Sequence, residues 1–183
     1  MERIAEYDSQ LASIFQTAVV SVFSTQDSAA PGSMTVRAAL GSIWIYPRAN
    51  WKVEDLVEAY VHELTHTLVM LDEHRFWHYP HYDRLEREEN LVHSAIRSEK
   101  RSLFASAHSI FVANELLQVR ERHHGHKMEF QLHPQSRDIR ENALRALESI
   151  LSLANIDLLA SPRLRSLLEK SGQQLSAIQS ARL

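Results

Sequence analysis

The chain has 183 residues, a formal net charge of -3 and no cysteine. Its 44% of hydrophobic and 23% of charged residues are typical of a folded globular protein and exclude a disordered chain. The slightly acidic balance favours neither nucleic acid nor a membrane as partner. Without cysteine there is no disulfide and no thiolate ligand, so any metal must be held by His, Asp or Glu.

The length suits one compact domain, which we expect to span residues 1–183. The acidic segment 1–8 lacks the apolar run of a signal peptide, and no stretch approaches the roughly 18 uncharged apolar residues of a membrane span. We therefore expect a cytoplasmic location.

The first half of the chain predicts two helices separated by strands. Residues 3–22 carry apolar side chains near helical spacing and predict an amphipathic helix, which a loop over 24–32 follows. Residues 34–47 favour one or two short strands that end at Pro47. From Val53 to Leu71 apolar residues occur on most sides, which predicts a buried central helix.

The second half predicts an irregular segment and three helices. Residues 72–100 are polar and read as irregular, with a short helix between Arg84 and His93. A long helix is expected from Leu103 to Glu121, ending near Gly125, and two more after Ser136 and after Ser161-Pro162, the last ending near Gly172. The predicted fold class is mainly α (α+β): a single helical domain with a small β-hairpin or short sheet around a central buried helix.

The strongest chemical signal lies on that central helix, in the sequence His62-Glu63-Leu64-Thr65-His66. Residues four apart share one helix face, so the two imidazoles can bind a single metal ion. With 11 histidines in the chain, a chance match is a real alternative. Because buried polar side chains without partners cost a few kcal/mol, the apolar context favours a metal site. Glu63 is placed to orient or deprotonate a metal-bound water.

A third protein ligand must come from elsewhere, and spacing alone does not choose it. The candidates are Asp72, Glu73, His74, His78, His81, Glu88, Glu89, His93, His108 and Glu115. Val69 and Asp72 exclude the extended metzincin pattern.

Beyond the motif, about residues 31–117 resemble the HExxH-type peptide β-hydroxylases, iron- and 2-oxoglutarate-dependent enzymes that modify ribosomally synthesised peptides. The matching segments are Pro31-Gly32, Gly41-Ser42-Ile43-Trp44-Ile45-Tyr46-Pro47, Val61-His62-Glu63-Leu64-Thr65-His66, Arg97-Ser98-Glu99-Lys100-Arg101-Ser102-Leu103 and Phe104-Ala105-Ser106-Ala107-His108-Ser109-Ile110-Phe111. Glu99 stands where the family usually has Asp, and Ser109 where it has Gly.

The resemblance implies an Fe(II)/2-oxoglutarate-dependent oxygenase that hydroxylates a side-chain carbon of a peptide, such as a leader-bearing precursor. It implies His62, His66 and His108 as the iron ligands, with Arg97 or Arg101 as the anchor of 2-oxoglutarate; a guanidinium suits a carboxylate. Solvated surface roles are the alternative for both arginines. In this interpretation Glu63 supports a ligand or a bound water instead of acting as a proteolytic base.

Two other hypotheses stay open. One is a zinc metallopeptidase of the gluzincin type, with Glu63 as general base on a Zn²⁺-bound water and Glu115 or His108 as third ligand. The other is a non-enzymatic scaffold with a structural metal site.

Two histidine-rich stretches also call for an interpretation. His123, His124 and His126 are interpreted as a polar helix end, where cations favour the helix dipole, in preference to a second metal site. His74, His78 and His81, with their aromatic neighbours, suit either a peptide groove or an ordinary loop.

Overall fold

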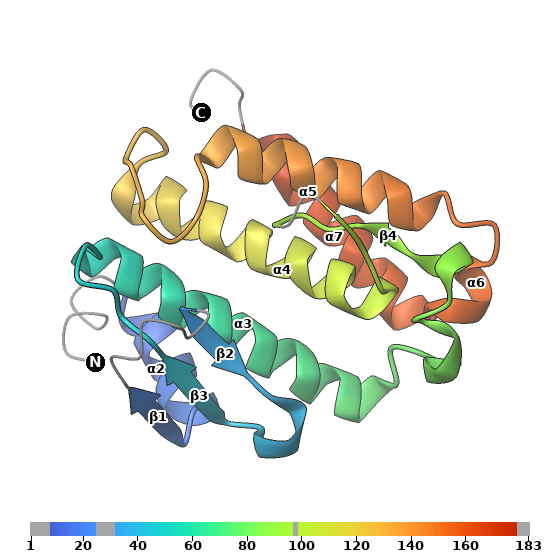
Figure 1. Ribbon diagram of the computed structural model, residues 1–183, viewed down its shortest axis with the longest axis horizontal. Coiled ribbons are helices and arrows are strands. Elements are labelled where there is room, and N and C mark those ends of the chain that lie inside the picture. Colours follow the sequence, from blue (N-terminus) through green and yellow to red (C-terminus); the bar gives the residue numbers. More distant parts are fainter. Residues whose placement is uncertain (1–7, 25–31, 97–98, 179–183) are drawn as a thin grey trace.

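The computed structural model describes residues 8–24, 32–96 and 99–178 (Figure 1). Its longer helices are α2 (Ser9–Ala18), α3 (Val53–Phe76), α4 (Leu103–Val119), α5 (Ser136–Leu151) and α7 (Pro162–Ala177), with a short α6 (Ile156–Leu159). Its strands are β1 (Ser21–Ser24), β2 (Ser33–Thr35), β3 (Ser42–Ile45), β4 (Val92–His93) and β5 (Lys100–Arg101). The predicted class, a mainly α fold with a small sheet, is confirmed.

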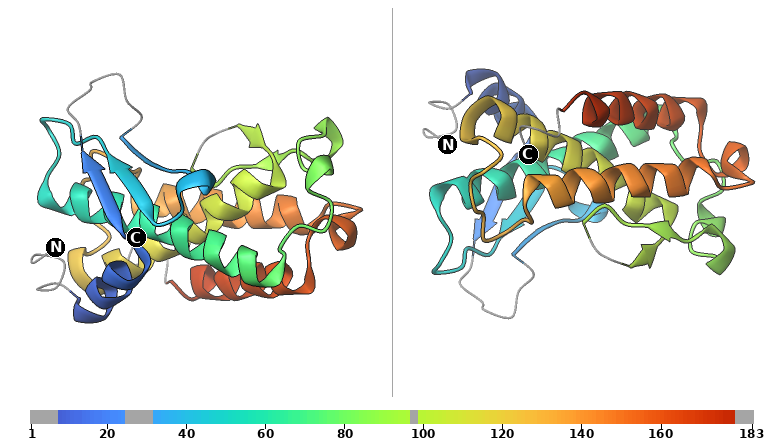
Figure 2. Two further views of the ribbon diagram at one scale, coloured as in Figure 1. Left: turned by 90° about the horizontal axis from the view of Figure 1, so that it is seen from below. Right: turned by 90° about the horizontal axis from the view of Figure 1, so that it is seen from above.

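Helix α3 lies at the centre of the molecule, as predicted. The sheet and α2 lie on one side of it, and α4, α5 and α7 lie on the other (Figures 1 and 2). Many of its side chains are buried, among them Val57, Ala59, Val61 and Leu64. The helix runs to Phe76, five residues past the predicted end, so Asp72, Glu73 and His74 extend it.

The sheet has the order β1-β3-β2, with β3 parallel to β1 and antiparallel to β2. Ile43 and Ile45 of β3 are fully buried against α3 and α2. Strand β2 is an outer strand of this sheet among the described residues, and it contacts α3. The strands predicted within residues 34–47 are thus confirmed.

The N-terminal helix is shorter than expected. It ends at Ala18, and Val22, predicted to be helical, lies in β1 opposite Ile43. Residues 19–23 are rich in β-branched and aromatic side chains, which suit a strand as well as a helix. Pairing with β3 selects the strand. Residues 3–7 of the predicted helix and residues 25–31 of the predicted loop, Pro31 included, lie outside the described residues.

The segment between α3 and α4 contains two 3₁₀ turns, Tyr82–Arg84 and Glu88–Asn90, followed by the β4–β5 ladder. Between Arg84 and His93, where a short helix is expected, the helical structure is the 3₁₀ turn Glu88–Asn90, and Asn90 donates to the Arg84 carbonyl.

The C-terminal helices form the larger hydrophobic cluster with α4. Helix α4 continues as a π-helical turn, Arg120–His124, and stops at Gly125 as predicted. Helix α7 runs past Gly172 to Ala177, because Gly172 is used for close packing instead of termination. A Cβ at that position would lie 2.5 Å from a methyl carbon of Leu147 in α5.

None of the helices within the described ranges is both long enough and apolar enough to cross a membrane.

The turn before β3 gives a test of the fold. Gly41 has φ +85°, a Cβ there would lie 3.3 Å from the Ala18 carbonyl oxygen, and its own carbonyl accepts from Val20 and Ser21. We expect Gly41→Ala to lower the free energy of unfolding, measured by urea denaturation, by more than the roughly 1–2 kcal/mol that positive φ alone costs, because the added Cβ also crowds the Ala18 carbonyl. Gly125→Ala is the matched control, since Gly125 also has positive φ but open space around it. Equal losses in both variants would contradict the role of the backbone contact.

Candidate metal centre

The two motif histidines face each other on α3. The Nε2 atoms of His62 and His66 lie 3.1 Å apart, a separation suited to two ligands of one ion. Burial lowers the pKa of His66 to about 4, and burial, with the neighbouring imidazoles His66 and His133, lowers the pKa of His62 well below its usual value. Both imidazoles are therefore neutral near pH 7, the state in which histidine binds a metal.

His108, the predicted third ligand, comes from α4 and lies beside His66. The Nδ1 atoms of the two rings are 3.0 Å apart, and the Phe104 ring packs on His108 with centres 4.2 Å apart. Its Nε2 is buried and has no hydrogen-bond partner. Burial lowers the pKa of His108 well below its usual value, as do the charges of His66, Arg37 and His78.

Glu63 is buried next to the histidines. Its Oε1 lies 3.9 Å from Nε2 of His62, and its Oε2 is buried without a hydrogen-bond partner. Burial raises the pKa of this carboxyl group, while hydrogen bonds from Ser33 and Thr35 of β2 act in the opposite direction. A carboxylate here, with one uncommitted oxygen, can accept a proton or orient a water molecule.

These side chains open onto a cavity of about 480 Å³. It is lined by His62, Glu63 and His66 from α3, by β2, by Ser94, Ile96 and Arg101 from the β4–β5 segment, by Ala105 and Ser109 of α4, and by Leu132 and His133. His108 is not among the lining residues, and it contacts His66, which is one of them.

Arg101 is the predicted anchor that reaches this cavity. Its side chain is half-exposed. Its Nε lies 3.9 Å from Oε1 of Glu99, an exposed carboxylate with which it forms a long ion pair. The segment before it is fixed to α4, since Ser109 accepts from the Ala95 amide and Ser106 donates to the Val92 carbonyl. Arg97, the alternative anchor, lies outside the described residues.

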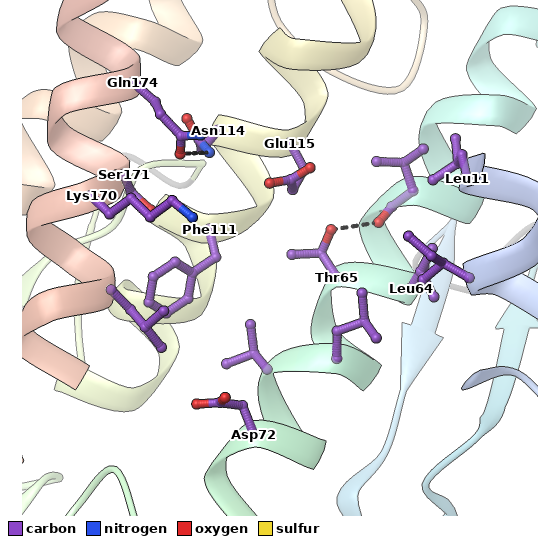
Figure 3. Close-up of a pocket in the computed structure, with 15 residues that line it drawn as sticks. Leu11, Leu64, Thr65, Asp72, Phe111, Asn114, Glu115, Lys170, Ser171 and Gln174 are labelled. Atoms are coloured by element: carbon purple, nitrogen blue, oxygen red, sulfur yellow. Dashed lines mark hydrogen bonds between the residues drawn. The ribbon is translucent and has the colours of Figure 1, made fainter. Parts of the chain in front are cut away.

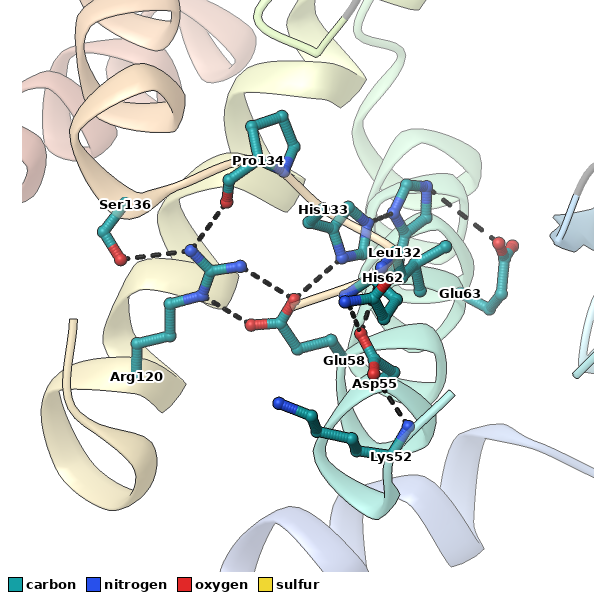
Figure 4. Close-up of polar contacts among 11 residues, drawn as sticks. Lys52, Asp55, Glu58, His62, Glu63, Arg120, Leu132, His133, Pro134 and Ser136 are labelled. Atoms are coloured by element: carbon teal, nitrogen blue, oxygen red, sulfur yellow. Dashed lines mark hydrogen bonds and ion pairs between the residues drawn. The ribbon is translucent and has the colours of Figure 1, made fainter. Parts of the chain in front are cut away.

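The sequence interpretation missed His133. Its Nε2 lies 3.0 Å from Nδ1 of His62, and its Nδ1 lies 2.9 Å from an oxygen of Glu58 (Figure 4). Glu58 forms a fully buried ion pair with Arg120, with contacts of 2.5 and 2.9 Å. The sequence did contain one indication of such a partner. Glu58 lies one turn before His62 on a helix predicted to be buried, and a buried carboxylate requires a polar or charged partner.

Burial opposes ionisation of Glu58, but hydrogen bonds from His133 and Arg120 outweigh it and lower the pKa of the carboxyl group. Arg120 donates further to the Pro134 carbonyl and the Ser136 hydroxyl, and its guanidinium carbon lies 3.9 Å from the centre of the Phe130 ring. The ion pair therefore has hydrogen-bond partners on both sides.

Asp55, at the start of α3, fixes the loop that carries His133. Its Oδ1 accepts from the backbone amides of Gln131 and Leu132 at 2.6 and 3.0 Å, and its Oδ2 accepts from the Lys52 amide. One fully buried carboxylate thus ties the helix end to residues just before His133.

The other candidate ligands lie elsewhere. Asp72 pairs with His78 and Arg163, and Glu73 with Arg37. The side chains of His74, His81, Glu88, Glu89 and His93 are exposed. His74 and His78 line a separate cavity of about 280 Å³ with Trp77 and Tyr82. A peptide groove at this cavity stays a prediction.

Glu115 lines a different pocket from the two motif histidines. This pocket, of about 360 Å³, lies between α2, α3, α4 and α7, and Leu11, Thr65 and Lys170 share it (Figure 3). Glu115 and His108 are seven residues apart on α4, and only His108 contacts His66.

The histidines after α4 have local partners. His123 contacts Asp8 at 3.3 Å, and His126 contacts Glu121 at 2.6 Å. The interpretation of a polar helix end stays a prediction.

Three observations fit a metal ion at the motif: neutral facing imidazoles, the unpartnered Nε2 of His108 and the unpartnered Oε2 of Glu63. Within the described residues, however, no group of three or more His, Asp or Glu side chains is already arranged to hold one ion. His66 faces His62 with one nitrogen and His108 with the other. His108 as third ligand stays a prediction.

The loop attachment is testable. We expect Asp55→Ala to lower the free energy of unfolding by about 2–4 kcal/mol, because three backbone amides lose a charged acceptor. Glu54→Ala, the neighbouring first-turn acid, should cost no more than about 1 kcal/mol of dipole stabilisation. Urea denaturation measures both, and a loss for Asp55→Ala no larger than for Glu54→Ala would contradict the attachment.

A scan against models of known protein families finds none that matches this chain, and a search among curated proteins finds no similar sequence.

Proposed function

We propose that this protein is an Fe(II)/2-oxoglutarate-dependent oxygenase that hydroxylates a side-chain carbon of a peptide. The observation that carries the proposal is the set of contacts among three histidines, two of which line a cavity that Arg101 also lines, while the third, His108, is buried. Imidazole nitrogens suit Fe(II), and three ligands on one side leave positions for a cosubstrate and dioxygen.

In this proposal His62, His66 and His108 hold the metal. His108 is the supported third ligand because its Nε2 has no other partner, whereas both nitrogens of His133 are already engaged. With 2-oxoglutarate and dioxygen, iron supplies the oxidising power that an unactivated carbon requires.

Arg101 binds the distal carboxylate of 2-oxoglutarate. It lines the cavity of His62 and His66, and its own ion pair with Glu99 is long and exposed, so the guanidinium can bind a dianion. Arg97 is retained as the alternative anchor.

Glu63 orients a ligand or a bound water. The position of its Oε1, 3.9 Å from His62 Nε2, suits indirect support better than direct hydrogen bonding. The Thr35 hydroxyl of β2 donates to the backbone carbonyl of Glu63 at 3.3 Å and joins this turn of α3 to the strand.

A peptide fits the site because an outer strand borders it. Ser33, Met34 and Thr35 of β2 line the cavity, and an extended peptide can pair with an outer strand while a side chain enters the cavity. A leader-bearing precursor peptide and a cytoplasmic location belong to the same proposal.

A zinc metallopeptidase is the second candidate. It is favoured by the uncommitted Oε2 of Glu63 beside the motif, which a general base requires. The gluzincin ligand Glu115 lies in the other pocket, so His108 would have to be its third ligand.

The reaction itself separates the two candidates. The purified protein is loaded anaerobically with Fe(II), given 2-oxoglutarate and a candidate peptide, and then exposed to oxygen. We expect succinate and a peptide heavier by one oxygen atom. Peptide cleavage with Zn(II), and no succinate with any peptide, would reject the oxygenase in favour of the peptidase.

Metal binding depends on the motif. We expect His66→Ala to weaken Fe(II) or Zn(II) binding by more than about 100-fold, beyond the loss expected for an outer-sphere partner, as measured by calorimetric titration. His93→Ala, an exposed histidine on β4, is the control and should bind like the wild type. Equal affinity in the two variants would contradict the site.

Cosubstrate binding depends on Arg101. We expect Arg101→Ala to raise KM for 2-oxoglutarate about 10- to 100-fold, the value of a lost charge-assisted hydrogen bond. Metal affinity should not change. Lys100→Ala, an exposed cation one residue away, should leave KM unaltered. If both substitutions raise KM equally, the positive charge of the segment, and not a specific contact of Arg101, accounts for cosubstrate binding.

A further inference from the structure

We propose that Arg120, Glu58 and His133 form a hydrogen-bonded relay that fixes the ring of His62, with its Nε2 lone pair toward the metal. His133 is thus a positioning residue and not a ligand. The inference rests on the proposed metal site, and it adds three residues that the motif does not include.

The contact between His133 and His62 has the geometry of a true hydrogen bond. The facing nitrogens are 3.0 Å apart, the ring centres 5.2 Å apart, and the planes differ by 15°. Because the centres are farther apart than the nitrogens by about two ring radii, the nitrogens lie near the line joining the centres. The rings therefore meet edge to edge in nearly one plane, as donor and lone pair require.

The chemistry of the chain fixes each proton. Glu58, held ionised by Arg120, only accepts, so His133 must donate to it from Nδ1. In the tautomer whose one ring proton is on Nδ1, His133 has its lone pair on Nε2 and accepts there from Nδ1 of His62. This leaves the lone pair of His62 on Nε2, the atom that faces His66.

Burying the charges of Glu58 and Arg120 costs desolvation free energy that stability of the fold does not require. Glu58 and Arg120 are both fully buried, and replacing a buried ion pair by apolar side chains often leaves stability unchanged or higher. Arg120 also starts the π-helical turn at the end of α4, a distortion that is frequent at functional sites. Carboxylate–histidine pairs behind a metal ligand fix its tautomer and raise its basicity.

The corresponding contact of His66 differs. It meets His108 through Nδ1, but no carboxylate follows, since Nε2 of His108 has no partner. Among the three proposed ligands and within the described residues, a carboxylate-anchored contact reaches His62 alone, and His108 keeps a nitrogen available for the metal.

Tautomers give the direct test. In the full-length protein labelled with ¹⁵N-histidine, long-range ¹H–¹⁵N spectra report which ring nitrogen carries the proton. We expect His133 and His62 to be protonated at Nδ1, both without metal and with Zn(II). Protonation of either ring at Nε2 in both states would overturn the relay.

Metal affinity gives the second readout. We expect His133→Phe to weaken Zn(II) binding roughly 10- to 100-fold, the range for outer-sphere partners, and to leave the Co(II) absorption spectrum unchanged in type. His133→Gln, which can still accept from His62, should recover part of the affinity. Unchanged affinity in His133→Phe overturns the relay, and a Co(II) spectrum showing a lost imidazole makes His133 a ligand instead. His93→Phe is the control.

A double variant tests whether the charges of the relay, and not only the packing around it, determine the tautomer of His133. Glu58→Gln combined with Arg120→Met removes the charges but keeps the volume, and such replacements are tolerated in buried ion pairs. A folded double variant should show His133 in mixed tautomers and weaker Zn(II) binding, whereas a single retained tautomer with wild-type affinity overturns the relay. If the wild type binds no metal, the proposed function fails, and the metal-free tautomers alone then decide the relay.

Discussion

The structure depends on one constraint: the buried face of α3 carries carboxylates that need partners. A buried carboxylate or imidazole without a partner costs several kcal/mol. Asp55, Glu58 and Glu63 are almost completely buried, and Glu63 lines the cavity together with His62 and His66. The elements around α3 supply partners to Asp55 and Glu58, whereas Oε2 of Glu63 has no hydrogen-bond partner among the described residues.

Those neighbours come from distant parts of the sequence. Strand β2 supplies the Thr35 hydroxyl to the Glu63 carbonyl, α4 and the π-helical turn after it supply His108 and Arg120, and the loop before α5 supplies His133. Because these contacts converge on one helix, the polar groups also hold the sheet, α4 and the loop in register with each other. Stability and the candidate metal centre therefore have the same physical origin.

Helix α4 shows how position along an axis decides a role. His108 and Glu115 share a face, but seven residues separate them by roughly 10 Å along the helix. At His108 the helix passes the motif, whereas at Glu115 it passes Thr65 and the end of α2. Facing the same way is thus not enough for two residues to serve one site.

The sequence by itself determined the mainly α class, the strands of residues 34–47, the buried helix and the HExxH pair, because periodicity and i, i+4 spacing are local properties of the chain. Tertiary structure alone decided that residues 21–24 form a strand, that α7 continues through Gly172, that His133 reaches His62, and that Glu115 lies in another pocket. These outcomes depend on strand pairing, on close helix packing and on a buried ion pair between residues 62 positions apart. No local pattern encodes such contacts, since they exist only once the chain has folded.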